Sequence, residues 1–159
     1  MNKDSVALVR IRREVEDELA LLERLPVEYA SIPSSIEEWI RIRTKASLLH
    51  DFYTGLERIF SRIAQELNGG VPNTEQWHRD LLKDMSLDLE GIRPPVISKE
   101  LFNDLLPFLR FRHLFRNLYG FELDWDRMSA LDRDFPAISA RSFSETRSFL
   151  EWMKATAGT

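Results

Sequence analysis

Apolar residues near the start of the chain recur at three- and four-residue intervals, which is the spacing of one helix face. This stripe extends from Ser5 to about Leu25, and its members are Leu8, Ile11, Val15, Leu19 and Leu22. Charged residues occupy most of the positions between them. The pattern predicts an amphipathic helix that buries one face against the rest of the protein.

A longer and broader apolar face follows between Ile36 and Leu67, as the central helix of a bundle requires. We expect the following side chains to point into the core: Trp39, Ile42, Leu49, Phe52, Leu56, Ile59, Phe60 and Ile63. The Asn-Gly-Gly sequence at residues 68–70 predicts the end of this helix, because glycine readily adopts the left-handed conformation that ends helices.

The start of this second helix is predicted by Ser34 and Glu37, which have the spacing of a capping box. In a capping box the two side chains bind each other's free backbone amides at the first turn. Pro26 and Pro33 precede it and predict a connection between the first two helices.

A third, shorter helix is predicted after Asn73, with apolar side chains at Trp77, Leu81, Leu82 and Met85. A fourth helix is predicted from about Lys99 to Tyr119, with Pro107 inside it. Its apolar side carries Leu101, Leu105, Phe108 and Phe115, and Arg112 and Tyr119 lie along the same side.

Ser142 and Glu145 form a second candidate capping box and predict the start of a last helix that extends through Trp152. Asp124 also suits the N-cap position of a helix. Alternation of apolar and polar residues with period two is scarce. The sequence therefore predicts an all-α fold, an antiparallel up-down bundle of four to five helices, in which residues 1–159 form a single domain.

Composition narrows the possible functions. The chain has no cysteine, which excludes disulfides, thiolate zinc sites and cysteine nucleophiles. No apolar run has the length of a signal peptide or membrane span, so we expect a cytoplasmic protein that does not enter the membrane. The net charge of −4 argues against a general nucleic-acid coat protein, and no DNA partner is expected. Arginine predominates among the 22 basic residues, and its forked group suits phosphate and carboxylate.

One segment, residues 109–119, concentrates three arginines, a histidine, an amide and a phenol. On an ideal helix Arg112, Arg116 and Tyr119 share a face, and His113 and Asn117 lie one step around. Two guanidinium groups beside a phenol could clamp a phosphate. The alternative is structural, because a buried arginine also pairs with a carboxylate on another helix or across a homodimer interface.

The order Arg112, four residues, Asn117, one residue, Tyr119 resembles the motif at the end of a long bundle helix in HepT-like toxins of the HEPN superfamily. That motif is an arginine, four residues, a histidine, one residue and a tyrosine, so Asn117 stands in the place of the histidine. Residues 48–60 and 77–82 also resemble segments of a HepT-like subgroup.

The resemblance implies a homodimer whose motif helices face each other and form a metal-independent endoribonuclease site that needs no cofactor. It also implies a nucleotidyltransferase antitoxin as partner, which inhibits the toxin by attaching AMP to Tyr119. Arg112 and Arg116 would bind the phosphate of the RNA substrate, with Arg112, His113 and Asn117 as the catalytic set. A nucleotide on Tyr119 would add negative charge beside the arginines and block the clamp.

Asn117 exchanges no proton near neutral pH, so the replacement of histidine weakens the expected catalysis. His113 is a candidate to compensate, although it points about 100° away from Arg112 on an ideal helix. The alternative function is a non-catalytic module that binds a nucleotide or the substrate of a nucleotidyltransferase. A plain structural dimer is the third interpretation.

Two further residue groups invite a functional interpretation. His50, Asp51 and Glu57 suggest a metal site, but bundle sites of this kind pair Glu-x-x-His sequences on facing helices and this chain has none. We therefore expect no metal. Trp77 and His78 could stack on a nucleobase, yet core packing is the more common use of such a tryptophan.

Overall fold

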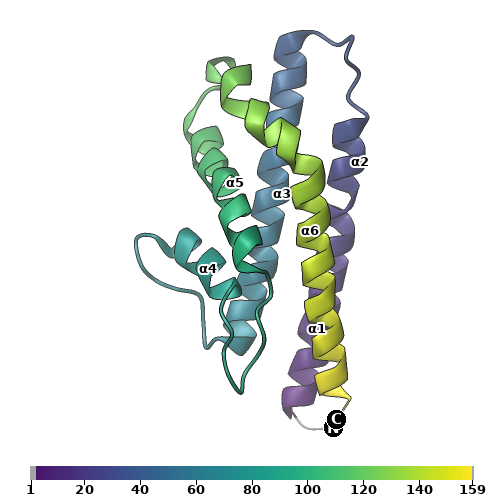
Figure 1. The fold of residues 1–159 in the computed structure, drawn as a ribbon, viewed down its shortest axis with the longest axis vertical. Coiled ribbons are helices and arrows are strands. Elements are labelled where there is room, and N and C mark those ends of the chain that lie inside the picture. The colour runs from purple at the N-terminus through teal and green to yellow at the C-terminus, as the bar shows by residue number, and fades with distance from the viewer. Residues whose placement is uncertain (1–2, 159) are drawn as a thin grey trace.

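The molecule is a bundle of long helices that lie side by side in antiparallel order (Figure 1). The computed structural model describes residues 3–158 except the side chain of Phe121. The elements are α1 (Lys3–Leu22), α2 (Arg24–Ala30), α3 (Glu38–Leu67), α4 (Trp77–Met85), α5 (Lys99–Asn117), the short 3₁₀ helix η1 (Gly120–Glu122) and α6 (Trp125–Ala157). The bundle consists of α1 with α2, α3, α5 and α6. The short helix α4 lies to one side of it (Figure 1).

The described residues contain no strand, and the predicted all-α bundle is confirmed. No helix within residues 3–158 has the length and apolarity that crossing a bilayer would demand.

The helical stripes predicted from the sequence form the core. The α1 positions Ile11, Val15, Leu19 and Leu22 are buried. Trp39 is an exception, because 58% of it is exposed. It lies in the first turn of α3, and its indole N–H donates to Glu37 Oε2 at 2.6 Å. The expectation that Trp39 points into the core is therefore wrong: the apolar period extends into a turn that other helices do not cover.

The connection before α3 differs from the prediction. Residues 24–30 form α2 instead of a loop, separated from α1 at Glu23. Pro26 explains the break, because it lacks the N–H that would bind the Leu22 carbonyl and its ring crowds that oxygen. The predicted capping box at Ser34 and Glu37 is wrong, since Glu37 is the N-cap of α3 and makes no side-chain cap bond.

The last helix begins earlier than the sequence suggested. α6 starts at Trp125, and the Asp124 side chain accepts a hydrogen bond from Arg127 N at 2.9 Å, as its predicted N-cap role requires. The capping box at Ser142 and Glu145 is wrong. Both residues lie inside α6, where the Ser142 hydroxyl donates to the carbonyl four residues earlier at 2.7 Å.

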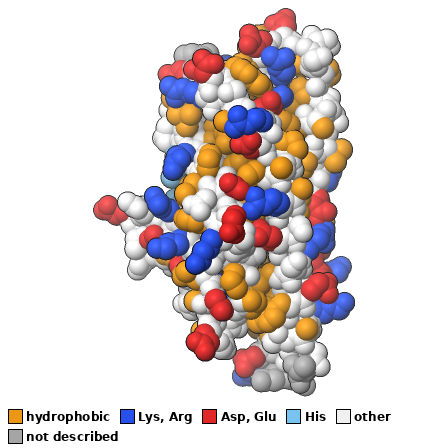
Figure 2. Space-filling view, viewed as in Figure 1, with side chains coloured by type: hydrophobic (Ala, Val, Ile, Leu, Met, Phe, Trp, Pro, Cys, Tyr) orange, Lys and Arg blue, Asp and Glu red, His pale blue; other side chains and the backbone are white. Residues whose placement is uncertain are grey.

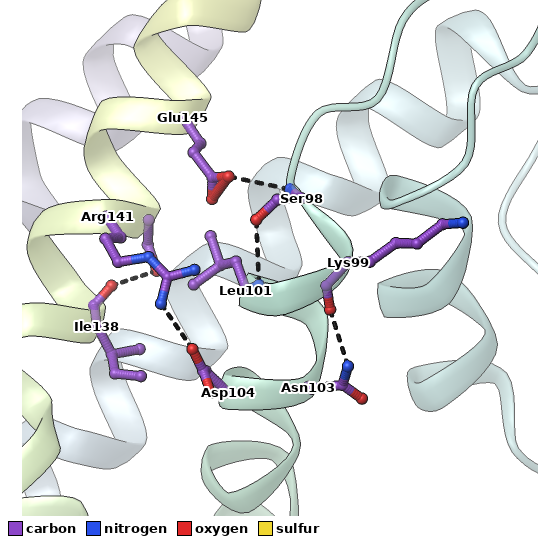
Figure 3. A network of polar contacts seen from close by, with 9 residues as sticks. Ser98, Lys99, Leu101, Asn103, Asp104, Ile138, Arg141 and Glu145 are labelled. Atoms are coloured by element: carbon purple, nitrogen blue, oxygen red, sulfur yellow. Dashed lines mark hydrogen bonds and ion pairs between the residues drawn. The ribbon is translucent and has the colours of Figure 1, made fainter.

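Glu145 instead joins α6 to the start of α5 (Figure 3). Its Oε1 accepts from Ser98 N at 3.1 Å, while the Ser98 hydroxyl caps α5 by accepting from Leu101 N at 3.1 Å. One turn further, Arg141 Nη1 contacts Asp104 Oδ2 at 2.6 Å. The position of α5 is thus fixed at its N-terminal end.

Arg93 holds the segment between α3 and α5, residues 68–98, in which α4 lies. Its side chain is 2% exposed and donates to Asn68 Oδ1 at 2.8 Å and to the carbonyl oxygens of Asp84 at 2.9 Å, Leu87 at 3.2 Å and Pro94 at 3.0 Å. These bonds join the beginning of the segment to its end. They fix the position of α4 beside α3 and α5.

Gly55 lies where α1 and α3 approach closely, and a Cβ there would overlap the buried Leu22 side chain. We expect Gly55→Ala to lower the free energy of unfolding by up to about 2 kcal/mol, because overpacking costs about 1–3 kcal/mol and the gain in helix propensity of about 1 kcal/mol offsets part of that cost. Urea denaturation measures this. In a Leu22→Ala background the cost should vanish, and an equal cost in both backgrounds would contradict the close approach.

Candidate functional site

The C-terminal half of α5 has an inward and an outward face. Phe108, Phe111 and Arg112 are buried, whereas His113, Arg116 and Asn117 are exposed. The helix ends at Asn117, and Leu118 is extended with φ −113° and ψ 146°. Tyr119 therefore lies outside the helix, and the expectation that it continues the Arg112 and Arg116 face is wrong.

Arg112 forms an ion pair inside the chain. Its Nη2 lies 3.5 Å from Oε1 of Glu57 on α3, and the two side chains are only 7% and 9% exposed. The structure thus shows the intramolecular pairing that the sequence left open as the alternative. Arg112 Nε is buried and has no hydrogen-bond partner among the described groups. The pair is surrounded by core, and burial together with the Glu57 charge raises the pKa of the neighbouring Tyr53 hydroxyl.

Glu57 has a second partner on a third helix. Its other oxygen, Oε2, lies 2.7 Å from Nδ1 of His78 on α4. The His78 ring stacks on Trp77 with the centroids 3.6 Å apart, and Trp77 packs against the core as expected. One carboxylate on α3 therefore fixes a guanidinium on α5 and an imidazole on α4.

His113 meets His78 across the interface between α4 and α5. The two ring centroids are 5.3 Å apart and the rings are nearly perpendicular, at 87°. Both histidines line a pocket of about 280 Å³, together with Glu75, Gln76, Arg79, Leu106, Leu109 and Arg110. Lys and Arg side chains lie over α4 and the neighbouring part of α5 (Figure 2). Partial burial lowers the pKa of the largely exposed His113, and the His78 and Arg112 charges act in the same direction.

His50 takes no part in this pocket. Its ring packs on Phe115 of α5 with a centroid distance of 4.7 Å, and its Nδ1 is 3.6 Å from the adjacent Asp51. Burial lowers the pKa of His50 against the opposing effect of Asp51. Within the described residues, no three His, Asp or Glu side chains are grouped as a metal site would require.

The end of α5 presents a different set of groups. The Asn117 amide donates to the His113 carbonyl at 2.7 Å, so this side chain closes the last helical turn. Tyr119 is 72% exposed, and its backbone N–H donates to Glu122 Oε2 at 2.9 Å. Tyr119 precedes Gly120, which lines a pocket of about 310 Å³ with Glu38, Trp39, Ile42, Arg43 and Leu123.

Arg43 fills the space above Gly120. A Cβ on Gly120 would lie 2.6 Å from Arg43 Nε, so a side chain there would make the flexible Arg43 side chain shift. The Arg43 guanidinium also lies 5.6 Å from the centroid of the exposed Trp39 ring. An aromatic face and a cation thus lie next to the segment that carries Tyr119.

Of the predicted site residues, Arg112 and His113 are linked through two other helices: Arg112 pairs with Glu57, which binds His78, and the His78 ring lies against His113. Arg116 and Asn117 lie on the outer face of α5. Sequence reasoning missed the pairing of Glu57 with His78. The available signal was a glutamate on the most apolar face of α3, where a carboxylate needs a partner. That signal does not say which helix supplies it.

Comparison with known proteins supports the resemblance seen in the sequence. The model of the family described as HepT-like protein matches residues 44–153. The matched range includes α4, α5 and most of α3 and α6, and therefore every residue of the cluster described above. Comparison with curated proteins and with solved structures returns no match. Because the family match covers more than half of the chain, this protein belongs to the HepT-like family.

Proposed function

We propose that this HepT-like protein is the toxin of a toxin-antitoxin pair, a cytoplasmic homodimer that cleaves RNA without a metal ion. A nucleotidyltransferase antitoxin neutralises it by attaching AMP to Tyr119. The observation that carries the proposal is the exposure of Tyr119 at the end of α5: it is 72% exposed, whereas Tyr29 and Tyr53 are 7% and 1% exposed. Of the three tyrosines in the chain, Tyr119 is the one an enzyme can reach.

The surface next to Tyr119 suits a nucleotide. Trp39 offers an aromatic face on which any base stacks, and Arg43 offers a guanidinium for its phosphate. Both side chains line the pocket to which Gly120 contributes. A nucleotide on Tyr119 would thus be held over the end of α5.

Arg116 is the arginine best placed to contact RNA. It is exposed in the last turn of α5, and no ion pair joins it to the described carboxylates. Arg112 is held by the buried carboxylate of Glu57, which compensates its charge, so the phosphate contact falls to Arg116. Two copies of α5 facing each other in the dimer would double the positive charge in the cleft.

The test is overexpression together with RNA cleavage by the purified protein in EDTA. Wild type should stop growth and cut RNA. Arg116→Gln should slow cleavage about 10- to 100-fold, because a hydrogen bond to a charged group is worth about 1.5–3 kcal/mol. Arg133→Gln on the exposed face of α6 is the matched control and should cleave as wild type does.

Arg112→Ala is the less informative variant, because it leaves Glu57 buried without its partner and unsettles the fold. A wild-type protein that neither stops growth nor cleaves RNA would overturn the proposal.

One observation favours the second candidate function, a non-catalytic module that binds a nucleotide. The Asn117 amide is engaged with the His113 carbonyl, so position 117 supplies no proton-transfer group. AMP binding without RNA cleavage or growth arrest would favour this function.

A further inference from the structure

The pocket between α4 and α5 is lined by two imidazoles, groups that can exchange protons near neutral pH. Transfer of phosphate to the 2′-oxygen requires one group to accept a proton and another to give one to the leaving oxygen. His78 and His113 both line the pocket, and their ring centroids are 5.3 Å apart. Arg79 and Arg110 line the same space and offer positive charge for the phosphate.

His78 is fixed in orientation. Glu57 holds its Nδ1 at 2.7 Å, Trp77 stacks on its ring, and its side chain is 18% exposed. A carboxylate on Nδ1 selects the tautomer that carries the proton there, which leaves Nε2 to exchange a proton with a ligand. Glu57 also supplies a counter-charge when both ring nitrogens are protonated.

His113 is suited to the opposite role. It is largely exposed on α5, and its partial burial, together with the charges of His78 and Arg112, lowers its pKa, with Arg116 acting in the same direction and Glu57 against it. A histidine with a lowered pKa is neutral at pH 7 and can accept a proton. The two rings therefore have different environments: a carboxylate binds Nδ1 of His78, whereas partial burial and nearby positive charges lower the pKa of His113.

We propose that His113 and His78, and not position 117, are the catalytic base and acid of this protein. The inference rests on the proposed ribonuclease function. His113 takes the proton of the 2′-hydroxyl as the 2′-oxygen attacks phosphorus. The bond from phosphorus to the 5′-oxygen breaks, and His78 gives its proton to that oxygen. The products are a 2′,3′-cyclic phosphate and a 5′-hydroxyl, and proton exchange with water restores both rings. Glu57 is a positioning residue that acts through His78.

The experiment compares full-length variants on end-labelled single-stranded RNA in EDTA. His113→Gln and His78→Gln should each lower kcat/KM by about 100- to 10,000-fold, and the double variant should fall little further because the pair acts as a unit. His50→Gln is the matched control and should retain activity. Because His113 is exposed, His113→Gln should fold as wild type does, so the test does not depend on the stability of His78→Gln.

Further readouts separate chemistry from structure. The acid limb of the pH profile of kcat/KM, expected below pH 6.5, should disappear in His113→Gln. Added imidazole should partly restore His113→Gly. Glu57→Gln should lower kcat more than it changes KM. RNA with 2′-O-methyl groups should remain uncut.

Two negative results have different meanings. Wild type that cleaves RNA while both histidine variants keep full activity would overturn this inference and leave the proposed function standing. Wild type that cleaves no RNA would overturn the proposed function and the inference with it.

Discussion

Replacement of Glu57 by leucine should lower the free energy of unfolding by about 3 to 5 kcal/mol, the usual cost of leaving one member of a buried ion pair without its partner. Arg112 would remain in the core with its charge uncompensated, and His78 would lose its carboxylate. The Glu57 side chain is 9% exposed, so water cannot replace it at either partner. Urea denaturation followed by circular dichroism measures the change.

Two variants serve as references. Arg58 lies next to Glu57 on α3, and its exposed side chain pairs with Glu18 of α1. Arg58→Leu should therefore change the free energy of unfolding by less than about 1 kcal/mol. Glu57→Leu combined with Arg112→Met removes both charges and should recover most of the loss. A Glu57→Leu variant as stable as Arg58→Leu would mean that the Arg112 pair is not closed in solution.

Tyr119→Phe should make the toxin resistant to its antitoxin. In the proposed reaction the Tyr119 hydroxyl gives up its proton, its oxygen attacks the α-phosphorus of ATP, and pyrophosphate leaves. Phenylalanine has the same ring and lacks that oxygen. Cells that express both partners should then stop growing as completely as cells with the toxin alone, and mass spectrometry should find no added nucleotide on the variant.

The buried tyrosine Tyr29 provides the control. Tyr29→Phe removes a hydroxyl that donates to Asp132 inside the bundle, and this variant should still be modified and neutralised. An unmodified wild-type Tyr119 in cells with the antitoxin, or a Tyr119→Phe variant that is still neutralised, would contradict the proposed switch.

The main helices could be predicted from the sequence because their apolar residues repeat with the helical period. Most of the stripe of α1 and most of that of α3 are buried as expected, and Leu8 is partly buried. Helix starts were less predictable, since a Ser-x-x-Glu pattern is local. Whether its amides are free depends on the rest of the chain, and at Ser142 the helix already continues from Trp125.

The candidate site could be predicted only along the chain. Its arginine-rich segment was identifiable, because residues 109–119 are unlike the rest of the sequence. The partners of Arg112 and His113 were not identifiable, because Glu57 and His78 come from other helices. Charged side chains on two helices meet only if the helices are rotated so that they face each other. Neither helix propensity nor the apolar periodicity of the sequence predicts that rotation.

The bonding of Arg93 determines how the segment from residue 68 to 98 opens. One side chain contacts both ends of it, so the segment cannot fray gradually from either side. Its amides should exchange with deuterium together, as one cooperative unit. Because α4 belongs to that unit, each opening would withdraw His78 from Glu57 completely, and the protein would alternate between an assembled and a dismantled pocket.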